Sequence, residues 1–408
     1  MSAFDNLPRV SILPHIVLID KAVKDTDPRK VDLLVGAYRD ENSLPYVLPV
    51  VKRVEQVLAQ RINKGLDNHN YSAPDGLSGF SAEVARITLG EDCQAFQEGR
   101  LVCSQPSGNC SGLRVTFEVL KQILPTNYVY ASDPTWLTID SIVEKSGFQL
   151  MHYRYWDEAN KCLDFVGLTQ DLEAAPRGSV VIFQPAAHNP TGVDPTQEQW
   201  KIIAKIVQSR DLMTVFDSCY QGFVSGDLDQ DAWPMRHFAS LGMEMIINQS
   251  FSKTLGLYGE RVASFLMIVN DKSIIPRLKV TIFNCLTGLT GPGAAYGAKI
   301  AREVFSSLEL ESEWRDSVRS MTSRIKENRR KLRDRLEQLN GCPGSWSHIT
   351  RQNGMFSYTG LTPKQCAFLA VEKKVYIYPS GRANLGGLTD RDLEYVAQSF
   401  HEAQQIQE

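Results

Sequence analysis

Apolar positions in the middle of the chain follow two alternating spacings. Short apolar runs, typical of buried strands, are followed by stretches whose apolar residues recur every three to four positions, which is typical of amphipathic helices. This order predicts a mostly parallel sheet with helices on both faces. The strands are expected at 128–130, 149–153, 179–183 and 212–217, and the helices at 136–146 and 196–209.

Other patterns flank this central region. The prolines within residues 1–30 interrupt any long helix and predict an irregular arm, followed by a strand at 31–35 and a helix at 47–64. A helical pattern from 297 to 339, rich in Arg, Lys and Glu, is longer than most globular helices and predicts a bridge between two domains. The C-terminal stretch predicts strands at 355–358 and 375–378 and helices at 363–374 and 389–405.

Together these patterns predict an α/β protein of two domains. We expect a large domain at residues 45–305, built on the parallel sheet. A smaller α+β domain should combine residues 1–44 with residues 306–408. The sequence shows no repeat and no low-complexity segment that would suggest a different architecture.

Composition narrows the class of protein. The chain has 408 residues, of which 43% are hydrophobic and 22% charged, as in ordinary globular enzymes. The formal net charge of −3 gives no basic field for nucleic acid. The first residues lack a signal pattern, and no apolar run approaches the roughly 18 residues that cross a bilayer, so we expect a cytoplasmic protein without a membrane partner.

The eight cysteines are scattered without a C-x-x-C pair. This pattern favours free thiols in a reducing compartment over a disulfide framework, and it predicts no metal site.

The candidate chemistry centres on Lys253, which ends the segment Asn-Gln-Ser-Phe-Ser-Lys and is followed eight residues later by Arg261. Upstream lie Asp217 and Tyr220, and before them Asn189 within His-Asn-Pro-Thr-Gly. These groups match the needs of pyridoxal phosphate (PLP). Its aldehyde needs an amine, its ring nitrogen an acid partner, its ring oxygen hydrogen-bond donors and its phosphate an arginine with backbone N–H groups.

Each of these residues also has a simpler interpretation. A lone lysine is usually a surface residue, a lone aspartate after a strand usually caps a turn, and a lone tryptophan usually packs in a core. Asn189 and Asp217, however, both follow predicted strands, and ligands of parallel sheets lie beyond the carboxyl ends of the strands.

The chain resembles the class I aminotransferases of fold type I, and within them the aspartate aminotransferase family. The resemblance runs nearly end to end and implies a PLP-dependent transferase with a seven-stranded, mostly parallel sheet and a smaller α+β domain. It is carried by the segments 35–40, 47–51, 133–136, 188–192, 217–222, 250–253, 354–356 and 380–382.

The resemblance implies roles for the cofactor-binding residues. Lys253 would form the Schiff base with PLP and move the substrate proton, and Asp217 would pair with the ring nitrogen. Tyr220 and Asn189 would donate to the ring oxygen, and Trp136 would stack on the ring. Ser250, Arg261 and a loop before a helix would hold the phosphate; in that loop Gly108, Asn109 and Cys110 replace the family's Ser-Gly-Thr.

It also implies a substrate site and a partner. Arg382 would bind the substrate α-carboxylate near Gly36, with Trp136 and Asn189 lining the same site. Tyr71 matches a catalytic-site tyrosine that reaches the neighbouring subunit's phosphate, which implies a homodimer with shared sites.

Two departures concern substrate choice. Thr287 stands where the family has the arginine that reads the distal carboxylate of aspartate or glutamate, and Arg277 is ten residues away. Ile139 stands where the family has a histidine behind the ring-binding aspartate.

The functional prediction is a transaminase of amino-acid and keto-acid substrates with altered side-chain specificity. One alternative is a PLP-dependent lyase, or an enzyme of β/γ-substitution or C–C bond formation, on the same scaffold. The other is a non-catalytic binding protein, against which the retained Lys253, Asp217, Arg261 and Arg382 count.

Overall fold

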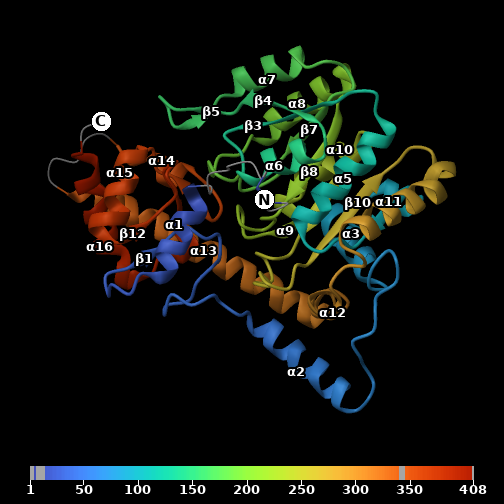
Figure 1. Cartoon of the computed structure of the whole chain (residues 1–408), viewed down its shortest axis with the longest axis horizontal. Coiled ribbons are helices and arrows are strands. Elements are labelled where there is room, and N and C mark those ends of the chain that lie inside the picture. The colour runs from blue at the N-terminus through green and yellow to red at the C-terminus, as the bar shows by residue number, and fades with distance from the viewer. Residues whose placement is uncertain (1–3, 6–13, 340–344, 407–408) are drawn as a thin grey trace.

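A seven-stranded sheet forms the centre of the protein in a computed structural model that describes residues 4–5, 14–339 and 345–406 (Figure 1). Its strand order is β2–β10–β9–β8–β7–β3–β4, and β10 alone runs antiparallel to its neighbours. The prediction of a mostly parallel sheet is therefore confirmed. The strands are β2 (Leu101–Ser104), β3 (Tyr128–Asp133), β4 (Gln149–Arg154), β7 (Val180–Phe183), β8 (Met213–Ser218), β9 (Met245–Ser250) and β10 (Ala263–Ile268).

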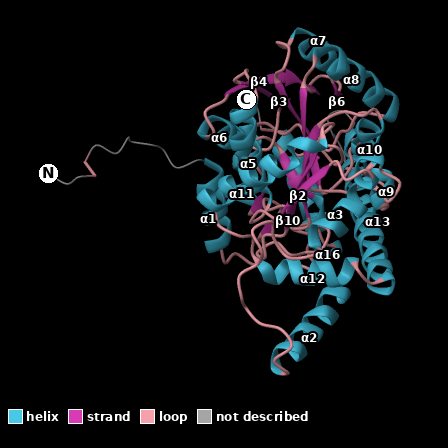
Figure 2. Cartoon of the chain, turned by 90° about the vertical axis from the view of Figure 1, so that its right-hand side faces the viewer, coloured by secondary structure: helices cyan, strands magenta, loops and turns pink. Residues whose placement is uncertain are grey.

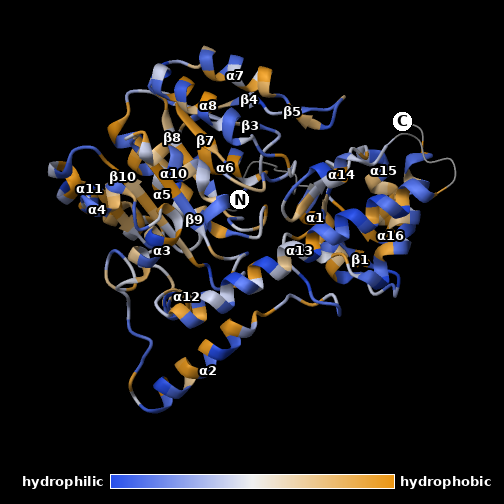
Figure 3. Ribbon diagram, turned by 180° about the vertical axis from the view of Figure 1, so that it is seen from behind, coloured by the Kyte–Doolittle hydropathy of each residue, from blue (hydrophilic) through white to orange (hydrophobic). Residues whose placement is uncertain are grey.

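Helices cover both faces of this sheet (Figure 2). Successive side chains of a strand point to opposite faces, and β8 shows this directly. Val215 belongs to an apolar cluster with α5 (Asn109–Ile123), α6 (Thr138–Lys145) and α11 (Ile275–Leu289), whereas Phe216 packs against α8 (Gln197–Arg210) and α10 (Trp233–Ser240). Because both faces are covered, these strands are hydrophobic along their length (Figure 3).

The two ends of the chain meet in a second lobe. Strand β1 (Val31–Asp32) pairs in parallel with β12 (Val375–Tyr376), and the long helix α13 (Leu308–Gln338) packs against α16 (Asp390–Gln404). We propose on this basis the domain division expected from the sequence, with residues 1–44 joined to 306–408 and residues 45–305 forming the larger domain.

Two predictions for the helices were wrong. The N-terminal arm is not wholly irregular, because α1 (Pro14–Lys24) forms between prolines. The pattern from 297 to 339 is two helices, α12 (Ala295–Phe305) and α13, separated at Ser306 and Ser307. The chain breaks there because the Ser307 hydroxyl accepts from the backbone N–H of Leu310 and caps a new helix.

The remaining elements are short or connect the two lobes. The helices are α2 (Pro49–Asn63), α3 (Phe80–Leu89), α4 (Gln94–Gln97), α7 (Phe165–Ala174), α9 (Leu228–Asp231), η1 (Lys272–Ile274), α14 (His348–Arg351), α15 (Pro363–Phe368), the π-helical turn η2 (Leu369–Lys373) and η3 (Leu385–Gly387); the strands are β5 (Trp156–Asp157), β6 (Cys162–Leu163), β11 (Phe356–Tyr358) and β13 (Arg382–Asn384).

Seven of the cysteines are free thiols in the structure, and Cys342 lies outside the described residues. Over those residues, no helix combines the length and apolar character needed to cross a membrane.

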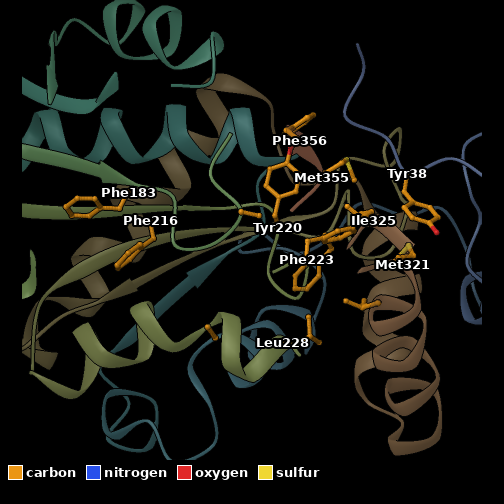
Figure 4. Packing of buried hydrophobic residues seen from close by; sticks show 14 of the residues in the cluster. Tyr38, Phe183, Phe216, Tyr220, Phe223, Leu228, Met321, Ile325, Met355 and Phe356 are labelled. Carbon is orange, nitrogen blue, oxygen red and sulfur yellow. The ribbon is translucent and has the colours of Figure 1, made fainter. Parts of the chain in front are cut away.

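One apolar core joins the sheet to the second lobe. Figure 4 shows Tyr220 and Phe356 between the sheet-side Phe216 and the α13 residues Met321 and Ile325. The Tyr220 and Phe356 rings meet edge to face with centroids 5.7 Å apart. This junction is therefore packed rather than a flexible linker.

A buried arginine holds the segment after α14 against α13. Arg329 is 2% exposed, and its guanidinium donates to four backbone carbonyl oxygens, those of Ile349, Asn353, Gly354 and Phe356. Burial lowers the pKa of Arg329 to about 9. The guanidinium thus satisfies the acceptors of a segment that leads directly into β11 and the candidate site.

Replacing Arg329 by methionine should destabilise the protein by roughly 2–4 kcal/mol, because several buried carbonyl oxygens lose their donors. The adjacent Arg330 offers a matched control, since its side chain is 55% exposed and its ion pairs among the described residues are with Glu327 and Asp334 on the same helix. Arg330→Met should cost about 0.5 kcal/mol or less. Chemical denaturation of both variants measures the difference; equal losses would contradict the role assigned to Arg329.

Candidate active site

A cavity of about 130 Å³ opens beyond the carboxyl ends of the central strands. Asp217 is the penultimate residue of β8, Lys253 follows β9 and Asn189 follows β7, so neighbouring parallel strands bring these side chains together. The cavity is lined by Asn109, Cys110, Trp136, Gln184, Asn189, Asp217, Cys219, Tyr220, Ser250, Ser252, Lys253 and Arg261.

The Lys253 amine is in a cationic and largely dry environment. Burial, together with the nearby positive charges of Arg261 and Arg382, lowers the pKa of Lys253 to about 8. Its Nζ atom lies 5.0 Å from the centre of the Tyr258 ring. A lysine with a lowered pKa carries a larger neutral fraction near neutral pH, and the neutral amine is the nucleophilic form.

Asp217 is the buried acid of the cavity. It is 6% exposed, and burial raises its pKa to about 6, against hydrogen bonds from Cys219 and Asn109 that favour the charged form. The Cys219 thiol donates to Oδ1 at 3.2 Å, and the Asn109 amide donates to the same oxygen. A carboxylate in this setting gains from a cation placed against it.

Arg261 lies beside the N-terminus of α5, in an arrangement suited to an anion. The Arg261 guanidinium contacts the Tyr258 carbonyl oxygen at 3.2 Å, and it forms no ion pair with any residue that the structure describes. Gly108, with φ of +80°, precedes the helix, and a Cβ atom there would lie 2.6 Å from Arg261 Nη2. Glycine therefore leaves room for Arg261 beside the free N–H groups of a helix N-terminus, which together suit a phosphate.

Arg382 is a buried cation near Tyr220 and Asn189. The Arg382 guanidinium is sandwiched between the rings of Phe356 and Tyr378, at 4.2 Å and 3.9 Å from their centres. It donates to Asn189 Oδ1 at 3.0 Å and to the Leu34 carbonyl oxygen at 2.8 Å.

Arg382 retains unused donor capacity. Its Nε is buried without a hydrogen-bond partner, and the guanidinium has no carboxylate partner within the described ranges. A buried, unpaired arginine is suited to binding a carboxylate in bidentate fashion.

Gly36 lies over the same region. A Cβ atom at Gly36 would approach Phe356 Cζ at 2.7 Å and the Tyr220 hydroxyl at 3.6 Å. Only glycine therefore fits this close to the Phe356 ring, which also contacts Arg382.

These groups fit PLP on chemical grounds. One cavity combines a lysine amine, a buried carboxylate and a phenol with an arginine beside a helix N-terminus. Arg261 and Arg382 have no anionic partner among the described residues, so each can accept one from a ligand. Among the residues that the structure describes, no group of three or more His, Cys, Asp or Glu side chains could hold a metal ion.

The structure brings most of the predicted cofactor residues into this cavity. Gly108 does not line the cavity but lies against Arg261, which does. Tyr71 lies elsewhere, with 89% of its surface exposed, so within one chain it reaches no candidate site. Thr287 and Leu289 are also exposed and do not line the cavity. Of Thr287, Leu289 and Trp136, only Trp136 lines the cavity of the single chain.

Sequence reasoning missed three lining residues, namely Gln184, Cys219 and Ser252. Gln184 Oε1 accepts from the backbone N–H of Asn189, and its Nε2 donates to the Asn189 carbonyl oxygen, so its amide fixes that residue from both sides. Its position just after β7 was a usable signal. Cys219, two residues from Asp217, could have been identified in the same way.

Comparison with known proteins gives consistent matches over nearly the whole chain. A family model described as aminotransferase class I and II matches residues 28–400. The cytoplasmic aspartate aminotransferase of Gallus gallus is 43% identical, with 98% of each chain covered.

Solved structures agree with these matches. The aspartate aminotransferase from Saccharomyces cerevisiae cytoplasm superposes with a TM-score of 0.94 at 36% identity over 98% of each chain. An aromatic-amino-acid aminotransferase from Burkholderia pseudomallei, covalently bound to pyridoxal phosphate, gives a TM-score of 0.93 at 31% identity over 99% of this chain and 100% of that one.

Proposed function

This chain belongs to the aminotransferase class I and II family, as a PLP-dependent aminotransferase, and we propose that it moves the amino group of an amino acid with an uncharged side chain. PLP, when bound, supplies an aldehyde that bonds to an amine and a ring that accepts electrons from the substrate Cα. The observation that carries the specificity is Thr287, which replaces the distal-carboxylate arginine.

The proposed roles follow from the charges and contacts of the cavity. Lys253 holds the cofactor and then, with its lowered pKa, takes and returns the substrate proton. Arg382 orients the substrate by its α-carboxylate, and the Asn189 amide holds the guanidinium in place. Asp217 stabilises positive charge at the ring nitrogen, because a carboxylate in a dry site favours a protonated partner.

Transamination is preferred over the two alternatives. The relatives described above are named as aminotransferases, which supports amino-group transfer over lyase or bond-forming chemistry. The full set of Lys253, Asp217, Arg261 and Arg382 supports an enzyme over a binding protein. Because the Gallus gallus relative is named as cytoplasmic, we also propose a cytoplasmic location.

The position of Arg277 supports the proposal that no arginine of α11 binds the distal carboxylate of a substrate. Thr287 is exposed near the end of α11, and Arg277 lies near the start of the same helix. A helix rises about 1.5 Å per residue, so ten residues separate the two positions by about 15 Å, too far for Arg277 to substitute. The Burkholderia pseudomallei relative is named for aromatic amino acids, so a chain of this likeness can serve a side chain other than aspartate.

Aspartate and glutamate should be poor amino donors. Loss of a bidentate arginine–carboxylate contact predicts roughly a 10- to 200-fold lower kcat/KM than for the best neutral amino acid. Stopped-flow half-reactions of the purified protein with aspartate, glutamate and a panel of neutral amino acids measure this ratio. Reaction with aspartate as fast as with the best neutral donor would overturn the proposed specificity.

Two variants separate the effect of position from that of charge. Thr287→Arg should raise the aspartate rate, whereas Thr290→Arg adds the same charge three residues away at another exposed position. Only Thr287→Arg should change the ratio of kcat/KM for aspartate to kcat/KM for neutral amino acids.

We further propose that the active unit is a homodimer with shared sites. The chain between α2 and α3 runs as a long loop outside the main body (Figures 1 and 2). On this loop Leu66 is 74% exposed and Tyr71 is 89% exposed, so both side chains are accessible to a second copy of the chain. A second copy that receives this loop would place Tyr71 beside the partner's phosphate site.

Subunit mixing tests this arrangement. A heterodimer of one Tyr71→Phe chain and one Lys253→Ala chain should regain about one intact site, because Tyr71 of the second chain completes the site of the first. Lys253 and Arg382 belong to the same site in one chain, so mixing Lys253→Ala with Arg382→Ala should restore no activity. Failure of the first mixture, with heterodimer shown by mass, would contradict a shared site.

A further inference from the structure

We infer that Asn109 is a positioning residue that orients Asp217 and keeps it charged, in place of the histidine missing at position 139. The inference rests on the proposed function, because it concerns the carboxylate that would meet the cofactor ring nitrogen. Its evidence is a hydrogen-bonded group of three buried or half-buried side chains, Asn109, Asp217 and Cys219.

Asn109 is placed for this contact by the start of α5. It is the first residue of the helix and is 6% exposed. Its Nδ2 donates to Asp217 Oδ1 and lies 3.3 Å from Cys219 Sγ. Cys219 Sγ donates to the same Asp217 oxygen at 3.2 Å, so one carboxylate oxygen receives both donors.

The other carboxylate oxygen remains available to a ligand. Among the described residues no side chain or backbone N–H donates to Asp217 Oδ2, although Asp217 lines the cavity. Two donors on Oδ1 therefore fix the plane of the carboxylate and leave Oδ2 as the acceptor for a protonated ring nitrogen.

Position 139 contributes nothing to this arrangement. Ile139 is fully buried in the apolar cluster that also contains Val129, Val143 and Phe265. An isoleucine there has no donor, and burial by itself favours the neutral acid. The donors that oppose this effect come from the phosphate-binding side of the cavity and from Cys219.

The consequence is a link between two ends of the cofactor site. Gly108 packs against Arg261, and the next residue, Asn109, holds Asp217. The same turn of chain thus serves the anion site and the acid, and a change at Asn109 should alter the titration of Asp217 rather than phosphate binding alone.

The experiment is a comparison of Asn109→Ala and Asn109→Asp in the full-length protein. PLP affinity is titrated from pH 5 to pH 9. Loss of a donor raises the pKa of Asp217, so in Asn109→Ala the pH below which binding weakens should rise by about one unit. Asn109→Asp keeps the size but adds a second carboxylate, and should shift that pH further.

Controls separate this role from packing. If Asn109 only fills space, the isosteric Asn109→Asp variant behaves like the wild type, which overturns the inference. A loss of affinity that is equal at every pH assigns Asn109 to the phosphate and also overturns it. Ser111→Ala, in the same helical turn but outside the group of three, should leave the pH profile unchanged.

A second readout is independent of cofactor binding. Without PLP, the drop in Tm caused by Asn109→Ala should be larger at pH 8 than at pH 4.5, because ionising Asp217 costs more once its donor is lost. In an Asp217→Asn background this pH dependence should vanish; its persistence there overturns the inference. A wild type that fails to bind PLP while the melting pattern holds would instead refute the proposed function.

Discussion

A carboxylate that must carry charge in a nearly dry cavity is the constraint on which the site depends. Burial favours the neutral form of Asp217 and raises its pKa to about 6. The structure opposes this effect with donors from two elements, the first turn of α5 and the end of β8. Lys253 experiences the opposite penalty, which lowers its pKa to about 8. The acid and the amine are thereby brought closer in pKa than they are in water.

Two arginines without an anionic partner among the described residues also shape the charge of the site. Arg261 and Arg382 are held by carbonyl oxygens, an amide and aromatic rings, and within the described chain neither meets a carboxylate. Burying either guanidinium without an anion is costly, and an anionic partner offsets this cost. Such a site can bind a substrate and a cofactor that each carry an anionic group. The fold supports this arrangement through packed contacts, since the Tyr220 and Phe356 rings join the sheet to the second lobe beside Arg382.

Sequence reasoning predicted what depends on local pattern. The parallel sheet follows from buried strands that alternate with helices, and the placement of Asn189 and Asp217 follows from the ends of those strands. The break between α12 and α13 was missed because the helical pattern continues through a cap made by one serine hydroxyl. The contact of Asn109 with Asp217 was missed because it joins residues 108 positions apart through their side-chain rotamers.

These charges converge on a single reactive amine, and chemical mapping identifies that amine. The protein is incubated with PLP, reduced with borohydride, digested and analysed by mass spectrometry. We expect a pyridoxyl group on Lys253 and none in a folded Lys253→Ala variant. Lys161 is the sharpest competitor, because burial also lowers its pKa although it lies outside the cavity. Modification of Lys161, or of any lysine other than Lys253, would show that Lys253 is not the reactive amine.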